Sequence, residues 1–176
     1  DRVTDIYLSE DIGATVHTGD VSGSAISTGS FGVLKLHKHN SGLGGDENTI
    51  FGNSAGEDLT TGNQNTFIGR GAGQNLTTST YATFIGTYAG YSATTGASNT
   101  IAIGQAMNSG TGTTNAVFIG RQAGQYTAGG DANGTVAIGH ETLRYNAVGR
   151  YNTAIGYVAG NLITTGQFNT LIGGLA

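Results

Sequence analysis

The sequence predicts an all-β protein, a parallel β-solenoid whose coils are about 17 residues long. Three observations support this fold class. One short phrase recurs through most of the chain, glycines stand at fixed places in every copy, and no stretch shows the sustained apolar spacing of a helix. The clearest copy of the phrase is Asn152-Thr153-Ala154-Ile155-Gly156. Recurrence at a fixed period of this size is the signature of a stacked repeat architecture.

Each copy of the phrase ends in a glycine, which we call the anchor glycine. The intervals between successive anchor glycines are 17, 17, 18, 16, 19, 17 and 17 residues. The near-constant interval predicts one coil of the solenoid per copy, with neighbouring coils stacked about 4.8 Å apart. The anchor glycines are Gly52, Gly69, Gly86, Gly104, Gly120, Gly139, Gly156 and Gly173.

Two apolar columns precede the anchor glycines. The residue directly before each anchor is always large, and the residue before that varies from alanine to phenylalanine. Because neighbouring side chains of a strand point to opposite faces, one column lies inside the coil and the other outside. We expect the constant column inside and the variable column outside, where further chains cover it. The isoleucine column is Phe51, Ile68, Ile85, Ile103, Ile119, Ile138, Ile155 and Ile172. The variable column is Ile50, Phe67, Phe84, Ala102, Phe118, Ala137, Ala154 and Leu171.

The rest of each repeat predicts a corner, a short strand and a turn. An Ala-Gly pair such as Ala72-Gly73 permits close approach and a positive φ. A Thr-Thr-Gly segment such as Thr94-Thr95-Gly96 combines a strand-forming residue with a turn-forming residue. A helical repeat is disfavoured, because each glycine costs about 1 kcal/mol in a helix interior. The least regular segments, residues 108–112 and 129–134, are predicted to be loops of altered length.

Composition limits the classes of function that remain. The chain has 176 residues with 32 glycines, no proline and no cysteine, and its formal net charge is −4. The presence of only seven basic residues argues against duplex nucleic acid as a partner. No apolar run is long enough to insert into a membrane. We divide the chain into a strand-rich stem or connector, residues 1–46, and a solenoid, residues 47–176. Because it starts without methionine and stops where a further coil would begin, we expect a fragment of a longer protein.

The phrase Asn-Thr-Ala-Ile-Gly, followed by Ala-Gly and Thr-Thr-Gly, resembles repeats in bacteriophage tail-fibre and capsid-fibre proteins. It is also similar to the head repeat of trimeric autotransporter adhesins, although the repeat here is longer. The resemblance covers residues 48–176 well and residues 22–32 weakly. It implies a left-handed, β-roll-like coil, a parallel homotrimer, and a place on a virion surface or another extracellular surface.

These observations predict a structural and adhesive segment of a trimeric phage fibre that takes part in host attachment. The first alternative is the head domain of a bacterial trimeric surface adhesin, and the second is a polysaccharide-degrading tail spike. No pair of carboxylates or nucleophile motif stands in a setting suited to catalysis. The sequence therefore predicts neither an enzyme nor a cofactor.

Five residues of the irregular section are candidates for contact with a host-surface glycan or protein receptor. Regular coils present the same small residues repeatedly, whereas arginine and aromatic side chains are the usual anchors of recognition surfaces. Two readings stay open for the tyrosines, a sugar-binding strip or a cross-coil ladder that adds stability. A third possibility is that the whole fragment is a spacer. The candidates are Arg121, Tyr126, His140, Arg144 and Tyr145.

Metal sites are weaker candidates. His37 and His39 lie two residues apart, and on a three-fold axis three such pairs would bring six imidazoles together. The alternative is a solvated strand edge beside Lys35 and Lys38. The segments 129–131 and 44–47 are similar to calcium-binding β-roll turns, but those need tandem copies and here each occurs once. We interpret both as plain turns.

Overall fold

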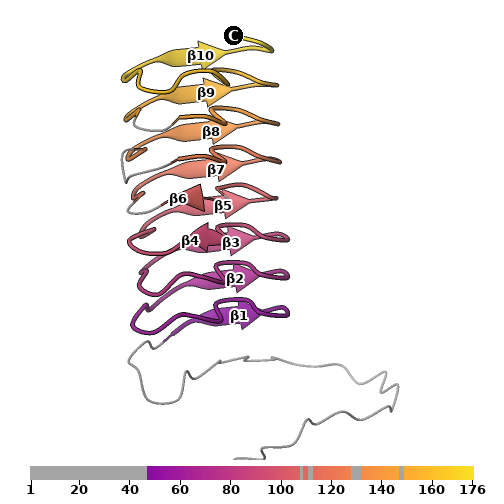
Figure 1. The fold of residues 1–176 in the computed structure, drawn as a ribbon, viewed down its shortest axis with the longest axis vertical. Coiled ribbons are helices and arrows are strands. Elements are labelled where there is room, and N and C mark those ends of the chain that lie inside the picture. Colours follow the sequence, from indigo (N-terminus) through magenta and orange to yellow (C-terminus); the bar gives the residue numbers. More distant parts are fainter. Residues whose placement is uncertain (1–46, 108, 111–112, 128–131, 147–148) are drawn as a thin grey trace, which may run out of the picture. The chain divides into compact units, whose positions relative to one another are not determined.

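The computed structural model describes residues 47–107, 113–127, 132–146 and 149–176, together with the backbone of 109–110. The predicted stem, residues 1–46, lies outside the described residues. The described chain forms a parallel β-solenoid with coils of about 17 residues, and no helix occurs in it. Its strands stack one above another from β1 to β10 (Figure 1). The predicted fold class is therefore confirmed for the repeat region.

Eight three-residue strands form the main sheet, and all of its pairings are parallel and in chain order. Two further two-residue strands pair with each other in a second sheet. The main sheet contains β1 (Thr49–Phe51), β2 (Thr66–Ile68), β3 (Thr83–Ile85), β5 (Ile101–Ile103), β7 (Val117–Ile119), β8 (Val136–Ile138), β9 (Thr153–Ile155) and β10 (Thr170–Ile172). The second sheet contains β4 (Ser92–Ala93) and β6 (Ser109–Gly110). Residues 109–110 thus belong to a short strand, whereas the sequence predicted a loop over 108–112.

The register places equivalent residues of successive repeats directly above one another. In β2 and β3, Phe67 pairs with Phe84 and Ile68 with Ile85. The anchor glycines continue this register, because the amide of Gly69 donates to the carbonyl of Phe51 at 2.8 Å. A β-carbon at Gly69 would lie 2.6 Å from the carbonyl oxygen of Gly86 in the next coil. Only glycine allows the coils to approach this closely, which explains the constancy of the anchor.

The two apolar columns lie on the opposite faces from those predicted. The variable column points into the coil, where Phe67, Phe84 and Phe118 are fully buried. The isoleucine column points outward, and 37% of Ile155 is exposed. The prediction placed the isoleucine column inside because a position that hardly varies was expected to lie in the core. In fact the interior of each coil is filled by several positions together, so one position can change in size when another compensates.

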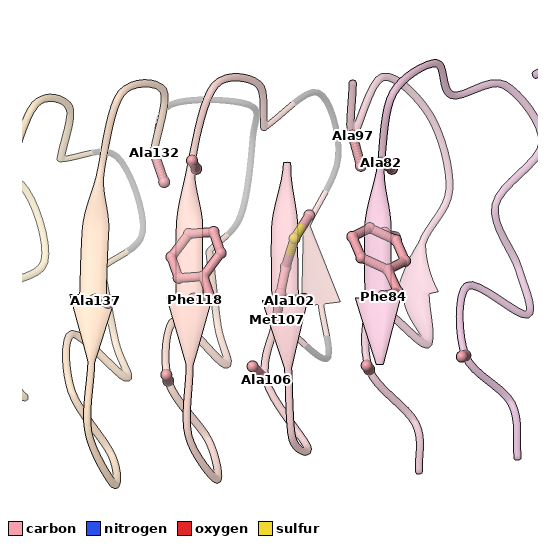
Figure 2. Close-up of a cluster of buried hydrophobic side chains, with 14 of the residues drawn as sticks. Ala82, Phe84, Ala97, Ala102, Ala106, Met107, Phe118, Ala132 and Ala137 are labelled. Atoms are coloured by element: carbon pink, nitrogen blue, oxygen red, sulfur yellow. The ribbon is translucent and has the colours of Figure 1, made fainter. Parts of the chain in front are cut away.

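The interior of the solenoid is a continuous apolar cluster that runs through the coils. Alanines, three phenylalanines, Leu59, Leu76, Met107 and Leu143 fill it. Figure 2 shows the side chain of Met107 on the coil that lies between the coils of Phe84 and Phe118. This cluster gives each chain a core of its own, so the coil does not depend on a second chain to cover the variable column.

Asparagines line one edge of the interior and satisfy buried backbone groups. The Asn65 side chain accepts from the amide of Ala82 at 2.9 Å and donates to the carbonyl of Ser79 at 2.8 Å. Asn65 also donates through its backbone and its side-chain amide to Oδ1 of Asn48. Asn152 and Asn169 repeat this pattern. The asparagine that opens the phrase therefore links one coil to the next.

Candidate functional site

The five predicted binding residues lie on two neighbouring coils, just after β7 and β8. In a solenoid, residues at the same distance from their anchor glycine form a column along the axis. Arg121 and His140 directly follow their anchors, whereas Tyr126 and Tyr145 follow six residues after theirs. The structure brings each pair into contact. We call these residues, with Gln125, Glu141 and Tyr157, the arginine–tyrosine cluster.

Tyr126, Tyr145 and Arg144 form the first half of the cluster. The two tyrosine rings stack with centroids 5.3 Å apart and planes inclined by 10°. The guanidinium carbon of Arg144 lies 5.1 Å from the centroid of Tyr145 and 5.7 Å from that of Tyr126. The predicted stacking between adjacent coils is confirmed. A stacked pair with a guanidinium over it gains both ring–ring and cation–π attraction.

Polar neighbours fix the position of Arg144. Its Nε donates to Oε1 of Gln125 at 2.9 Å, and its Nη1 lies 3.4 Å from Oε1 of Glu141. Desolvation lowers the pKa of the Arg144 guanidinium, but a hydrogen bond with Tyr126 and the charges of Tyr145 and Glu141 outweigh it, so the net pKa is raised. Arg144 therefore remains a cation, with part of its charge balanced by Glu141.

Arg121, His140 and Tyr157 form the second half of the cluster. Nη1 of Arg121 lies 3.1 Å from Nε2 of His140. Because a guanidinium can only donate, Nε2 is the acceptor in this hydrogen bond. The imidazole stacks on Tyr157 with centroids 5.4 Å apart and planes inclined by 11°. Nε2 of His140 also lies 3.9 Å from Glu141, which joins the two halves of the cluster.

Sequence reasoning missed three members of the cluster. Gln125 and Glu141 carry no motif, and only the coil-to-coil alignment shows that they flank Arg144. Tyr157 follows its anchor glycine directly, as Arg121 and His140 do. Aligning all repeats by their anchor glycines would have placed Arg121, His140 and Tyr157 in one column.

Other aromatic contacts occur elsewhere on the solenoid. Tyr151 stacks on Phe168 with centroids 5.2 Å apart, and both rings are exposed. Tyr88 and Tyr91 meet edge to face at 5.0 Å, with the guanidinium of Arg70 5.2 Å from the centroid of Tyr88. The second group also combines an arginine with two tyrosines, but it lies on two earlier, regular coils. It is therefore a matched comparison for experiments.

The predicted histidine pair, His37 and His39, lies outside the described residues, as does the segment 129–131. Within the described residues, no group of three or more histidine, aspartate or glutamate side chains is placed to hold a metal ion. The same part of the chain contains no helix of the length and apolar character that a membrane crossing requires.

Comparisons with known proteins give no relative of this chain. No protein-family model, no curated protein sequence and no solved structure matches it.

Proposed function

We propose that this chain is a structural and adhesive segment of a phage fibre, located on the virion surface and involved in host attachment. The observation that carries the proposal is the outer face of the main sheet. Each strand presents two outward side chains, and none of the strand residues in this sheet is charged. A long uncharged face with an isoleucine in nearly every coil suits contact with other copies of the chain.

The outward face also suits a parallel arrangement of copies. Its side chains recur once per coil, because equivalent strand residues lie directly above one another. Identical stripes on parallel chains therefore match in register along their whole length. Closed symmetric assemblies are the usual form of homo-oligomers. The resemblance of the repeat phrase to trimeric fibres and adhesins supplies the number of chains, a parallel homotrimer.

The contact between chains differs from the one that the sequence suggested. The variable column is buried within each coil and needs no partner. The contact between chains is instead made by the isoleucine column and by the residues two positions before it in each strand. Ile101, Val117 and Val136 make this second outward column apolar in the middle coils.

Sedimentation equilibrium of the full chain tests the proposal. We expect a species of three times the 17.8 kDa chain mass at micromolar concentration. A folded species at the mass of a single chain over the same concentrations would refute the assembly and, with it, the fibre function.

A further inference from the structure

We propose that the arginine–tyrosine cluster binds an anionic glycan, a sugar polymer that carries carboxylate or sulfate groups, and that Arg121 is the residue that binds the anion. This inference rests on the proposed attachment function and names the ligand class of that site.

In the part of the chain that the structure describes, no carboxylate balances the charge of Arg121. Its side chain is exposed, and its Nη1 contacts an imidazole nitrogen of His140 at 3.1 Å. Among the described residues, no carboxylate lies within 4.0 Å of it, whereas Arg144 has Glu141 at 3.4 Å. The charge of Arg121 is thus available to a ligand. A planar guanidinium can bind a carboxylate or sulfate through two parallel hydrogen bonds.

Arg121 is held in place before any ligand arrives. His140 fixes one of its terminal nitrogens, and the imidazole is itself stacked on Tyr157. A long side chain normally loses conformational entropy when it binds. The hydrogen bond to the imidazole reduces that loss, whereas a carboxylate partner would also balance the charge of the guanidinium.

Charge is distributed unevenly along the solenoid. Residues 47–107 contain three acidic side chains and one arginine, a net charge of −2. Residues 113–176 contain three arginines and two acidic side chains, a net charge of +1. An anionic polymer is therefore attracted to the coils that carry the cluster more than to the earlier ones. The first set is Glu47, Glu57, Asp58 and Arg70, and the second is Arg121, Asp131, Glu141, Arg144 and Arg150.

The exposed ring of Tyr157 favours a sugar rather than a protein as the ligand. One face of the Tyr157 ring lies on His140, yet 60% of Tyr157 is exposed. The equivalent position in the next coil is Gly174, where a β-carbon would meet nothing within 4 Å. No side chain of that coil position covers the second face of the ring. An open aromatic face beside a guanidinium offers stacking for a sugar ring and hydrogen bonds for its substituents.

The test uses three polymers with one backbone. The full chain is immobilised, and binding of dextran, carboxymethyl dextran and dextran sulfate is measured by biolayer interferometry at fixed salt. We expect at least one of the two anionic polymers to bind and dextran not to bind. Binding of carboxymethyl dextran indicates a carboxylate ligand, and binding of dextran sulfate indicates a sulfate ligand. Arg121→Gln should weaken binding by about tenfold, the loss expected for one charge-assisted hydrogen-bonded pair.

The matched control is Arg70→Gln, which removes the same charge from the same position in an earlier coil. It should change the affinity by less than twofold. An equal loss in both variants would mean that only overall charge matters and would overturn the proposal. Equal binding of dextran, or no binding of either anionic polymer, would overturn it as well, and in that case a protein receptor becomes the better candidate.

Sedimentation of the same samples separates the two proposals. A trimer that binds no anionic dextran refutes the ligand class but leaves the fibre function standing. A monomer refutes the fibre function. Circular dichroism of each variant, compared with the unaltered chain, shows whether a loss of binding comes from a loss of fold.

Discussion

The ring of Phe84 packs directly against the α-carbon of Gly90, six residues later on the same coil, so that a β-carbon at Gly90 would collide with the ring. Gly73 has the same relationship to Phe67, where a β-carbon would lie 3.1 Å from the ring. In the coils whose inward strand residue is Ala102 or Ala137, a larger residue replaces this glycine. These larger residues are Met107 and Leu143, and both are fully buried. In these four coils the interior is therefore filled by pairing a large residue with a small one.

The first prediction exchanges the two sizes within the coil of β8. Ala137→Phe alone should overpack the interior and lower the free energy of unfolding by about 1–3 kcal/mol. Leu143→Gly alone should leave a cavity and cost about 2–5 kcal/mol. The double variant recreates the Phe–Gly pair of other coils and also removes a side chain from a residue with a φ of 47°. We expect it to regain at least about 1 kcal/mol relative to the sum of the single changes.

Chemical denaturation of the four chains measures this coupling. Strictly additive losses would show that the two positions do not share one interior space. Gly174→Ala serves as the control, because nothing lies within 4 Å of the new methyl group, and it should leave the stability nearly unchanged.

The second prediction concerns the asparagine that opens the phrase. Asn65→Ala removes the side-chain partners of the Ser79 carbonyl and of the Ala82 amide. Leaving a buried polar group unpaired costs about 1–3 kcal/mol, so we expect a clear fall in the denaturation midpoint. The exposed Asn63 provides the control, and Asn63→Ala should cost less than about 0.5 kcal/mol. Similar losses in both variants would contradict a special role for the buried asparagine.

The repeat period was enough to predict the coil, its length and the parallel stacking, because a coil must return to the same register once per repeat. The face of each column was not predictable from constancy alone. Phe84 is replaced by Ala102 in the next coil without loss of packing, because Met107 fills the space. On the outward face, Ile85 pairs with Ile103 along the sheet. No other residue of the coil replaces the size of this side chain, so the position stays constant.

The candidate site was predictable in part. Tyr126 and Tyr145 share a position relative to their anchors, and that alone predicts their stacking. The contact between Arg121 and His140 follows from the same rule. The role of Glu141 could not be predicted, because it depends on how the Arg144 side chain turns back along its own coil. Periodicity places backbone positions, but it does not determine the direction of long side chains.

The third prediction tests the revised faces of the main sheet. Phe84→Asp buries an unpaired charge at several kcal/mol and should abolish the fold. Ile85→Asp places the charge on the outward face, so we expect a chain that keeps its β-type circular dichroism but sediments as a monomer. Thr87→Asp, at an exposed position beyond the anchor, should preserve both fold and assembly. Equal unfolding by Phe84→Asp and Ile85→Asp would place Ile85 inside the coil and would contradict the structure.

The last prediction separates the two roles of the tyrosine stack. Tyr126 and Tyr145 contact each other at 5.3 Å, and Tyr88 and Tyr91 contact each other at 5.0 Å, each pair with an arginine nearby. The double alanine variant of either pair should lower the free energy of unfolding, since an aromatic pair contributes about 0.5–1.5 kcal/mol beyond its burial. Only Tyr126→Ala/Tyr145→Ala should also weaken binding to host cells or to an anionic glycan, because Arg144 then loses the rings that orient it. Binding that survives this change but is lost in Tyr88→Ala/Tyr91→Ala would move the recognition surface to the earlier coils.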